Sequence, residues 1–547
     1  MDPSIHASPA TRRSRVAIAA ALLAALALVC WSTAGSSRAS AASGGQLVVG
    51  DAQAPTSFDP DGPASNLIAN LDGVENTYAP LVSLATVPNP YRKGGGGQFI
   101  NPNKFSPELA TKWKRTGDVW TFTLRSGVKA ANGDPFTAAD VVYSYQRALA
   151  LKATGAFLWA VFIKAKSVTA KGPHTLVIKT SGPAPMLLDT LALASQVWPI
   201  DARAVQAHKT TSDPNSATWL TSHTAGFGPF SLGTFTSGQS ATFTANPHYF
   251  GGKVAKSVKM IAIPDSAERF SSLQQGAIDV ALNLTPQQVS QADAAKKLHV
   301  FSFQGNSNTS VYLNLDVPQL QNALVRQAMW YATPSQQIIK SVYAGHAFLF
   351  KSEMPPDVPG YTSKYYTYKY NIAKAKALMA QAGLANGFST TMYYATNDPP
   401  LASVATILQA AWQQIGINVT LQAEPQPTLV AQSFGQKNLP VYLLDTASQI
   451  FPIGTEFGAL YSSTGFSNTT HYVNSAFDTA FTDSNSTWST KKILADTVAM
   501  QQATMSSPIY IPVAGLTTNI VTSSAIKNWV WDPSQAQRFL PAVTAGG

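Results

Sequence analysis

The chain has 547 residues, a formal net charge of +10, 45% hydrophobic residues and only 12% charged residues. A single core stops growing at about 250–300 residues, so this length predicts at least two lobes and the composition excludes a disordered or multi-spanning chain. Lysines and arginines are scattered singly rather than clustered, so no nucleic-acid partner is expected.

The first 41 residues have the pattern of a secretory signal peptide. Arg12, Arg13 and Arg15 precede an apolar stretch over 16–31, and Ala39-Ser40-Ala41 follows as a cleavage motif. The stretch is shorter than the roughly 20 residues that a transmembrane helix needs. We therefore expect an exported protein, periplasmic or on the extracellular face of the cytoplasmic membrane.

The only cysteine, Cys30, lies at the end of this apolar stretch, where a bacterial lipoprotein is cleaved and acylated. Lipoprotein signals favour a small residue before the cysteine, whereas Val29 stands here, so cleavage near Ala41 is favoured over a lipid anchor. Sec and twin-arginine export both stay open. No cysteine follows position 30, which excludes disulfides and thiol chemistry from the rest of the chain.

Strands and helices are predicted to alternate after the leader. Apolar runs or alternation predict strands at 46–50, 120–124, 278–280 and 417–421. Capping residues, apolar periodicity and closing glycines predict helices at 137–149, 265–276, 322–333, 371–383 and 401–415. The Pro- and Gly-rich stretch 85–106 predicts a long surface loop. The recurring order of helix, glycine and strand indicates an α/β fold.

Motifs for catalysis are absent from the sequence. There is no G-x-S-x-G elbow, no phosphate-binding P-loop and no H-E-x-x-H, and the eight histidines are dispersed. We therefore expect no catalytic residue, metal site or cofactor. A glycosidase-like carboxylate pair has no local signature, so an exported hydrolase stays open as an alternative.

Aromatic residues are instead plentiful, at 10% of the chain, and several fall in turn-rich segments, including Phe58, Tyr78, Phe227 and Phe451. Flat rings beside neutral polar groups suit recognition of a small solute without reaction. The alternative for each of these rings is a place in the core.

Several motifs occur in a family-like order along the chain, among them Ser57-Phe58-Asp59-Pro60, Tyr78-Ala79-Pro80-Leu81-Val82 and Asn246-Pro247-His248-Tyr249. Others lie at 107–113, 122–128, 135–141, 226–230, 263–265, 275–280, 312–315, 325–328 and 416–417. Together they resemble the family 5 extracellular solute-binding proteins of ABC importers, the dipeptide- and oligopeptide-binding group. The resemblance covers nearly all of the chain beyond the leader.

This resemblance implies a two-lobed α/β clamp of the class II periplasmic-binding-protein type. Lobe I would comprise 42–284 and 505–547, with an inserted subdomain at about 80–190, and lobe II would comprise 285–504. Two crossover strands, expected near 283–287 and 502–508, would form the hinge. A ligand would stabilise the closed form, because both lobes contact it only there.

The implied function is capture of a small peptide or another small solute, such as an opine or oligosaccharide, between the lobes. The protein, expected to be a monomer, would deliver this ligand to the membrane permease and ATPase of an ABC importer. A sensor or pheromone-type receptor on the same fold is the second possibility.

Peptide binders of this group hold the ligand's amino terminus with an acidic residue of the second lobe. The matching stretch, 442–452, retains Asp445 but lacks the usual tryptophan and the second Asp-Pro element, so peptide and other solutes both stay open. A capping role is the alternative for Asp445. The ligand-binding residues expected are Asp445, Thr446, Phe451, Phe58, Tyr78, Asn314, Trp330 and Phe227.

Overall fold

The computed structural model describes residues 46–90, 96–193, 196–356, 358–396, 398–447, 455–531 and 537–538. The predicted signal peptide, the cleavage motif and Cys30 lie outside these residues. The helices of the described part are all too short or too polar to cross a membrane. All the described residues belong to the compact unit that begins at Ala42.

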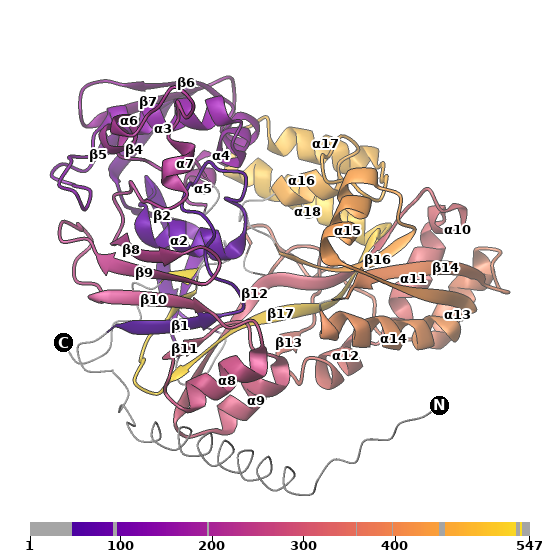
Figure 1. The fold of residues 1–547 in the computed structure, drawn as a ribbon. Helices are drawn as coiled ribbons and strands as arrows, with labels where there is room; N and C mark the ends of the chain where they lie inside the picture. Colours follow the sequence, from indigo (N-terminus) through magenta and orange to yellow (C-terminus); the bar gives the residue numbers. More distant parts are fainter. Residues whose placement is uncertain are drawn as a thin grey trace, which may run out of the picture. The chain divides into compact units, whose positions relative to one another are not determined.

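A mixed sheet of 11 strands forms the centre of the described part, in the order β15-β14-β16-β12-β17-β11-β1-β10-β9-β8, with β13 paired to β17. One half consists of β1 (Leu47–Asp51), β8 (Phe230–Thr236), β9 (Ser240–Ala245), β10 (Ser257–Ala262) and β11 (Val280–Ala281). The other half consists of β13 (Ala347–Phe348), β14 (Phe388–Ala395), β15 (Ile417–Glu424) and β16 (Val441–Ala447). Figure 1 shows the first half in indigo and magenta and the second in orange.

Two long antiparallel strands, β12 (Leu298–Leu313) and β17 (Tyr510–Ser523), join the two halves. Their pairing is interrupted between Gln304 and Asn308. Gly305 lies in this irregularity, where a Cβ atom would come within 2.3 Å of the carbonyl oxygen of Leu516. Only glycine allows the two backbones to approach so closely, and the break divides the pairing of the two long strands into two parts.

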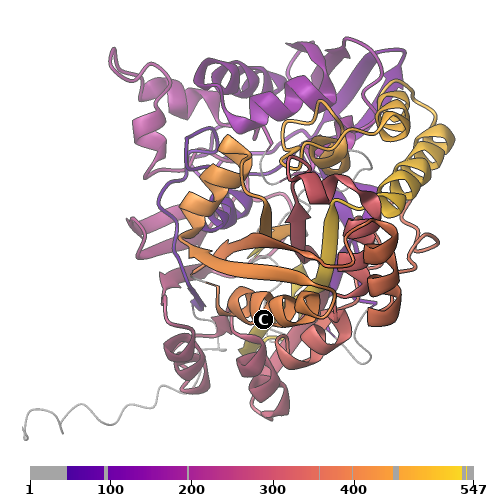
Figure 2. The ribbon, with the colours of Figure 1, turned by 90° about the vertical axis from the view of Figure 1, so that its right-hand side faces the viewer.

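Each half of the sheet has its own hydrophobic core. The core of the second half includes Val311 and Ala514, whereas Val300 and Val521 belong to a cluster in the first half. Helices α2 (Ile68–Thr77), α8 (Ser266–Gln274) and α9 (Pro286–Ala294) accompany the first half. The second half carries α10 (Pro318–Gln321), α11 (Ala323–Tyr331), α12 (Ser335–Ser341), α13 (Ile372–Gln381), α14 (Pro399–Gln413), α15 (Gln426–Val430), η2 (Ala431–Gln436), α16 (Thr455–Tyr461), α17 (Ser475–Ser484) and α18 (Thr490–Ser506). Figure 2 views the second half from its end, with helices around the orange strands.

The chain therefore passes between the two cores within β12 and β17. The predicted crossovers lie elsewhere: 283–287 runs into α9, whose Val289 and Ala292 pack in the first half, and 502–508 includes the end of α18. Spacing along the sequence does not distinguish a helix that precedes a crossover strand from the crossover itself.

An inserted subdomain has a third core, formed by residues between Ala79 and Val197 together with Phe227. Its sheet runs in the order β4-β5-β7-β6. The elements of this region are β4 (Ala110–Thr116), β5 (Val119–Leu124), β6 (Ala165–Ala170), β7 (Thr175–Thr180), α3 (Ala138–Leu151), α4 (Thr154–Leu158), η1 (Trp159–Ile163), α5 (Leu187–Leu191), α6 (Ala202–Ala207) and α7 (Ala217–Leu220). The capping box predicted at the start of α3 is present, because Thr137 and Asp140 bond each other's backbone amides.

The predicted loop at 85–106 is wrong. β2 (Val82–Pro88) and β3 (Gln98–Pro107) pair there as antiparallel strands, in a small sheet with β18 (Val530–Trp531) and β19 (Gln537–Arg538). Phe99 and Ile100 are neighbours in β3 whose side chains point to opposite faces, and both are buried, so packing outweighs the weak strand preference of the prolines and glycines nearby. In the last turn of α3, Arg147 and Ala148 are buried whereas the apolar side chain of Leu149 is 48% exposed.

A buried ion cluster ties the segment after β1 to the inserted subdomain. Arg147 of α3 binds Asp59 through both terminal nitrogens, each at 2.8 Å, and Asp61 through Nη1 at 2.6 Å. Its Nε donates to the carbonyl oxygen of Asn215 at 2.9 Å. The three charged side chains are at most 2% exposed. Burial raises the pKa of Asp61, and the positive charge of Arg147 opposes that rise.

We predict that Arg147→Met lowers the free energy of unfolding by about 3–5 kcal/mol, because two buried carboxylates lose their counter-charge. Chemical denaturation followed by circular dichroism measures the change. Arg203→Met is the matched control: Arg203 is 44% exposed and lies 3.8–4.0 Å from its carboxylate partners, so its loss should cost at most about 1 kcal/mol. Equal effects of the two substitutions would contradict the prediction.

Candidate functional site

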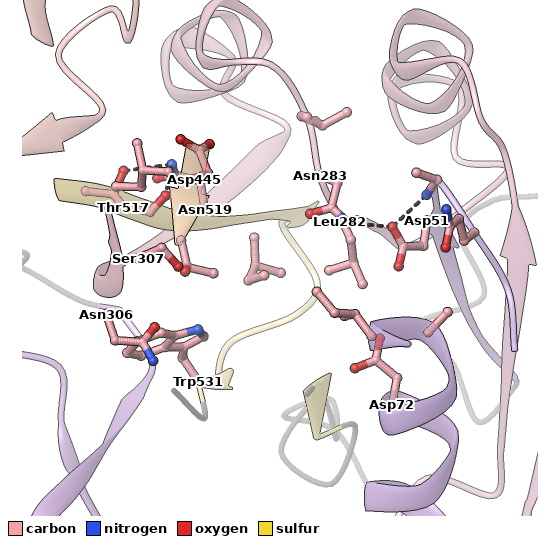
Figure 3. Close-up of a pocket in the computed structure, with 18 of the residues that line it drawn as sticks. Asp51, Asp72, Leu282, Asn283, Asn306, Ser307, Asp445, Thr517, Asn519 and Trp531 are labelled. Atoms are coloured by element: carbon pink, nitrogen blue, oxygen red, sulfur yellow. Dashed lines mark hydrogen bonds between the residues drawn. The ribbon is translucent and has the colours of Figure 1, made fainter. Parts of the chain in front are cut away.

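A cavity of about 680 Å³ lies where the two halves of the sheet meet. Its walls come from the end of β1, the first turn of α2, the residues after β11, the middle of β12 and β17, the end of β16 and Trp531 of β18. This volume is typical of sites that enclose a small organic molecule. Figure 3 shows side chains from both halves facing the cavity.

The first wall is formed at the carboxyl ends of β1 and β11, which are parallel neighbours. Parallel strands end at the same sheet edge, where binding groups of α/β proteins gather. Asp51 ends β1, and its Oδ1 accepts hydrogen bonds of 2.6 Å from Asn283 Nδ2 and from the backbone amide of Ala52. Asn283 has a positive φ of 53°, a backbone conformation that asparagine tolerates better than most residues.

The opposite wall is formed by β16 and by the start of α14. Asp445 and Thr446 lie opposite Thr309 and Asn308 in the antiparallel pairing of β16 with β12. Asp445 Oδ1 accepts a 2.5 Å hydrogen bond from the Thr309 hydroxyl, which also contacts the Tyr343 hydroxyl at 2.6 Å. Asp398, which also lines the cavity, caps α14 by accepting from the backbone amide of Leu401.

Burial makes these carboxylates costly to ionise. It raises the pKa of Asp445 to about 7, with a smaller contribution from the negative charge of Asp398, while the hydrogen bond from Thr309 opposes the rise. Burial also raises the pKa of Asp51 and of Asp398. A positively charged group bound beside them relieves this cost, because an opposite charge within a few ångströms favours the ionised form.

Neutral and apolar groups line the space between the two walls. Ser307 of β12 and Thr517 and Asn519 of β17 provide hydroxyl and amide groups, and the Trp531 ring provides a flat apolar surface. Among the described residues no cluster of metal-ligating side chains is found. The arrangement therefore offers carboxylates for a cation, neutral polar groups and an aromatic surface.

Two of the predicted ligand-binding residues, Asp445 and Thr446, line the cavity side by side on β16. Phe451 lies outside the described residues. The remaining five lie in cores away from the cavity lining: Phe58, Tyr78, Phe227, Trp330 and Asn314.

Packing explains the core positions in the first half and the inserted subdomain. Phe58 makes edge contacts with Phe235 and Phe243, with ring centroids 5.1 and 5.9 Å apart. Tyr78 packs beside Trp198 and donates a hydrogen bond to the carbonyl oxygen of Phe58, and Phe227 packs against Phe136. The expectation that these rings face a ligand is therefore corrected.

The same correction applies in the second half. Trp330 stacks on Tyr368, with centroids 3.9 Å apart. The amide of Asn314 donates to the carbonyl oxygens of Lys437 and Leu439, and so connects β12 to the loop before β16. An irregular segment can carry a core side chain as readily as a binding one, and sequence alone did not separate the two roles.

The cavity also contains residues that the sequence reasoning missed: Asp51, Asp398, Asn283, Asn519 and Trp531. A local signal existed for two of them. Asp51 directly follows the predicted first strand, at the position where functional residues of α/β proteins gather. Asp398 precedes Pro399, the usual arrangement of a helix N-cap followed by proline. Nothing local indicated that the two would share a cavity.

Comparison with known proteins gives a consistent result. Residues 104–468 match the family model of bacterial extracellular solute-binding proteins, family 5. The chain is 30% identical over 388 residues to the "Probable D,D-dipeptide-binding periplasmic protein DdpA" of Escherichia coli, with 70% of this chain and 71% of that protein covered. It is 26% identical over 350 residues to the "Dipeptide-binding protein" of the same organism, covering 59% of this chain and 64% of the relative.

Solved structures share the fold. The periplasmic binding protein DppA from Helicobacter pylori, in complex with the peptide STSA, has a TM-score of 0.73 at 22% identity and covers 91% of this chain and 97% of its own. The dipeptide-binding protein from Pseudoalteromonas sp. SM9913, in complex with Met-Leu, has a TM-score of 0.75 at 20% identity, covering 91% and 99%. The predicted periplasmic-binding-protein-like clamp is thereby confirmed.

We predict that Asp445→Asn stabilises the unliganded protein at pH 8 by about 1 kcal/mol. Asparagine keeps the oxygen that accepts the hydrogen bond from Thr309, and it removes the negative charge from this partly buried position. The folded-state pKa of about 7 lies above the ordinary value of 3.8, so the native state binds the extra proton between these two pH values, and wild-type stability falls as pH rises from about 4 to 7 and is level above that. The stabilisation should therefore be clearly smaller at pH 5 than at pH 8. Thermal melts at both pH values test this.

Asp316→Asn is the control for these melts, since the Asp316 side chain is 65% exposed. It should change stability by no more than about 0.5 kcal/mol at either pH. A stabilisation by Asp445→Asn that is the same at pH 5 and pH 8 would show that the charge is not its cause.

Proposed function

Because this chain belongs to the family 5 bacterial extracellular solute-binding proteins of ABC importers, we propose that it captures a small peptide or related amine-bearing solute and delivers it to a membrane permease. One observation carries this proposal: a ligand-sized cavity at the junction of two separately packed halves, with Asp445 in its wall. The ligand keeps all its covalent bonds in such a cycle, and the permease and its ATPase are the implied partners.

The N-terminal 41 residues give this function its location. The basic start, short apolar stretch and Ala39-Ser40-Ala41 motif direct export in our proposal, which matches the periplasmic relatives. Outside the cytoplasmic membrane a monomer binds the solute directly, and it contacts the permease at the outer face of the cytoplasmic membrane.

Asp445 holds the ligand's charged amine in this proposal. Its carboxylate lies in the cavity wall, and Thr309 holds one of its oxygens in place. An ammonium group there gains a charge-assisted hydrogen bond, which is about twice as strong as a neutral one. Relatives named as binders of dipeptides support an amino terminus as the source of this charge.

The hinge of the clamp lies, in our proposal, within the two long strands rather than at the sequence-predicted crossovers. The irregular pairing at 304–308 and its neighbours at 514–517 separate the part of each strand that belongs to each core. Bending there changes the distance between Asp51 and Asp445 while leaving both cores intact. A ligand that contacts both walls stabilises the closed state by its differential affinity.

We predict that Asp445→Asn weakens binding of alanyl-alaninamide by about 2–4 kcal/mol at pH 8, because a buried ammonium loses its counter-charge. Wild-type affinity should fall about tenfold per pH unit well below pH 7, where Asp445 must release a proton on binding. Thr309, Tyr343 and Asp398 are the polar groups around it. Isothermal titration calorimetry measures both effects.

N-acetyl-alanyl-alaninamide is the matched control ligand, since it has the same dipeptide amide skeleton and its acetylated nitrogen carries no charge. Its weak binding should be equal in the wild type and in Asp445→Asn. Unchanged affinity of the variant for the free amine would remove Asp445 from the binding site.

Closure should be visible in solution. We predict that saturating alanyl-alaninamide lowers the radius of gyration measured by small-angle X-ray scattering, because contacts with both walls favour the closed state. Asp445→Asn at the same ligand concentration should scatter like the unliganded protein. Scattering that stays identical with every ligand that binds would argue against a clamp.

A further inference from the structure

The charge of the cavity is opposite to that of the protein. Its described lining includes Asp51, Asp72, Asp398 and Asp445 and contains no lysine, arginine or histidine. The whole chain has 38 lysines and arginines against 28 acidic residues. A negative cavity in a positive protein attracts cations and repels anions, and low-dielectric walls strengthen this selection.

The carboxylates occupy two separate walls. Asp398 and Asp445 lie on the side of β16 and α14, and Asp51 lies on the side of β1 and β11, with Asp72 of α2 beyond it. Figure 3 shows Asp445 and Asp51 at opposite sides of the cavity, with Thr517 and Asn519 near Asp445. A ligand that spans the cavity therefore meets negative charge at both of its ends.

Neutral donors hold three of these carboxylates. Asp51 accepts from Asn283 and the Ala52 amide, Asp398 from the Leu401 amide, and Asp445 from the Thr309 hydroxyl. The cation nearest to Asp51 is Arg269, but its guanidinium donates to backbone carbonyls of residues 263–264 and 282–283. Burial raises the pKa of Asp51, Asp398 and Asp445, as expected where counter-charge is incomplete.

A free dipeptide fits this charge pattern poorly. It carries one ammonium and one carboxylate, and the carboxylate end would lie against the carboxylates of the second wall without a cationic side chain from the described lining. Burying an unpaired anion beside another anion is strongly unfavourable. A second cationic group at that end gains an ion pair instead.

We propose that the ligand is an organic dication: one positively charged nitrogen lies at Asp398 and Asp445, a second lies at Asp51, and no free carboxylate enters the cavity. This inference rests on the proposed function of the same cavity and narrows its ligand class. Basic peptides without a free carboxylate in the cavity and short diamines share this chemistry.

The test is a calorimetric ranking of four probes on the purified wild-type protein at pH 7, where their amines are mostly charged. Lysyl-alaninamide is a dication, alanyl-alaninamide a monocation, alanyl-alanine a zwitterion, and 1,5-diaminopentane a dication without a peptide bond. Lysyl-alaninamide should bind at least about tenfold more tightly than alanyl-alaninamide, and alanyl-alaninamide at least about tenfold more tightly than alanyl-alanine.

Asp51→Asn identifies the second charge site. It should reduce the preference for lysyl-alaninamide over alanyl-alaninamide to less than about threefold. Asp316→Asn, an exposed substitution outside the cavity, should preserve the full preference. If Asp51→Asn does not fold, the wild-type ranking alone decides the inference.

The outcomes separate this inference from the proposed function. Binding of alanyl-alanine as tightly as its amide, or tighter, overturns the dication inference and leaves peptide capture standing. Binding of 1,5-diaminopentane without binding of any peptide supports the dication inference and refutes peptide capture. Failure of all four probes to bind refutes both.

Discussion

The pairing of β12 with β17 is the constraint on which the rest of the structure depends. These two strands carry the chain between two separately packed cores. On one side of the irregularity β12 pairs with β16 of the second half, and on the other side β17 pairs with β11 of the first half. Because the backbone hydrogen bonds continue through both halves, the cores stay in register. The close approach at Gly305 makes this join the least regular part of both strands.

The position of the cavity follows from the same join. The carboxyl ends of β1 and β11 lie beside the part of β17 that belongs to the first half of the sheet. β16 pairs with the part of β12 that belongs to the second half, so Asp51 and Asp445 face a common space. A ligand in that space contacts both halves at once. Ligand binding and closure are therefore coupled, and the strength of this coupling depends on the contacts that form only when the two halves approach.

The carboxylates of this cavity illustrate a conflict between folding and binding. Ionised aspartates held by neutral donors cost stability in the empty protein, and the raised pKa of Asp445 expresses that cost. A cationic guest removes the cost on binding, so the same groups that weaken the empty protein favour the liganded one. The buried Arg147 cluster shows the contrasting solution, in which the chain supplies its own counter-charge.

Local patterns predicted much of the secondary structure. The helices beginning at Thr137 and Asn371 and the strand after Gly416 formed as expected, because capping, glycine termination and apolar alternation act over a few residues. Similarly, the motif at 442–452 pointed to Asp445 and Thr446. The hairpin of β2 and β3 was missed, because its stability comes from a distant strand, β18, and from buried side chains.

By itself, the sequence determined the α/β class, the family and one acidic residue of the cavity, since these follow from short-range patterns and ordered motifs. Only the tertiary structure decided which aromatic rings were core, where the chain crosses between halves, and that Asp51, Asp398 and Asp445 share one space. The physical reason is distance along the chain. Burial and electrostatic potential at a point sum over residues hundreds of positions apart, and no local window contains them.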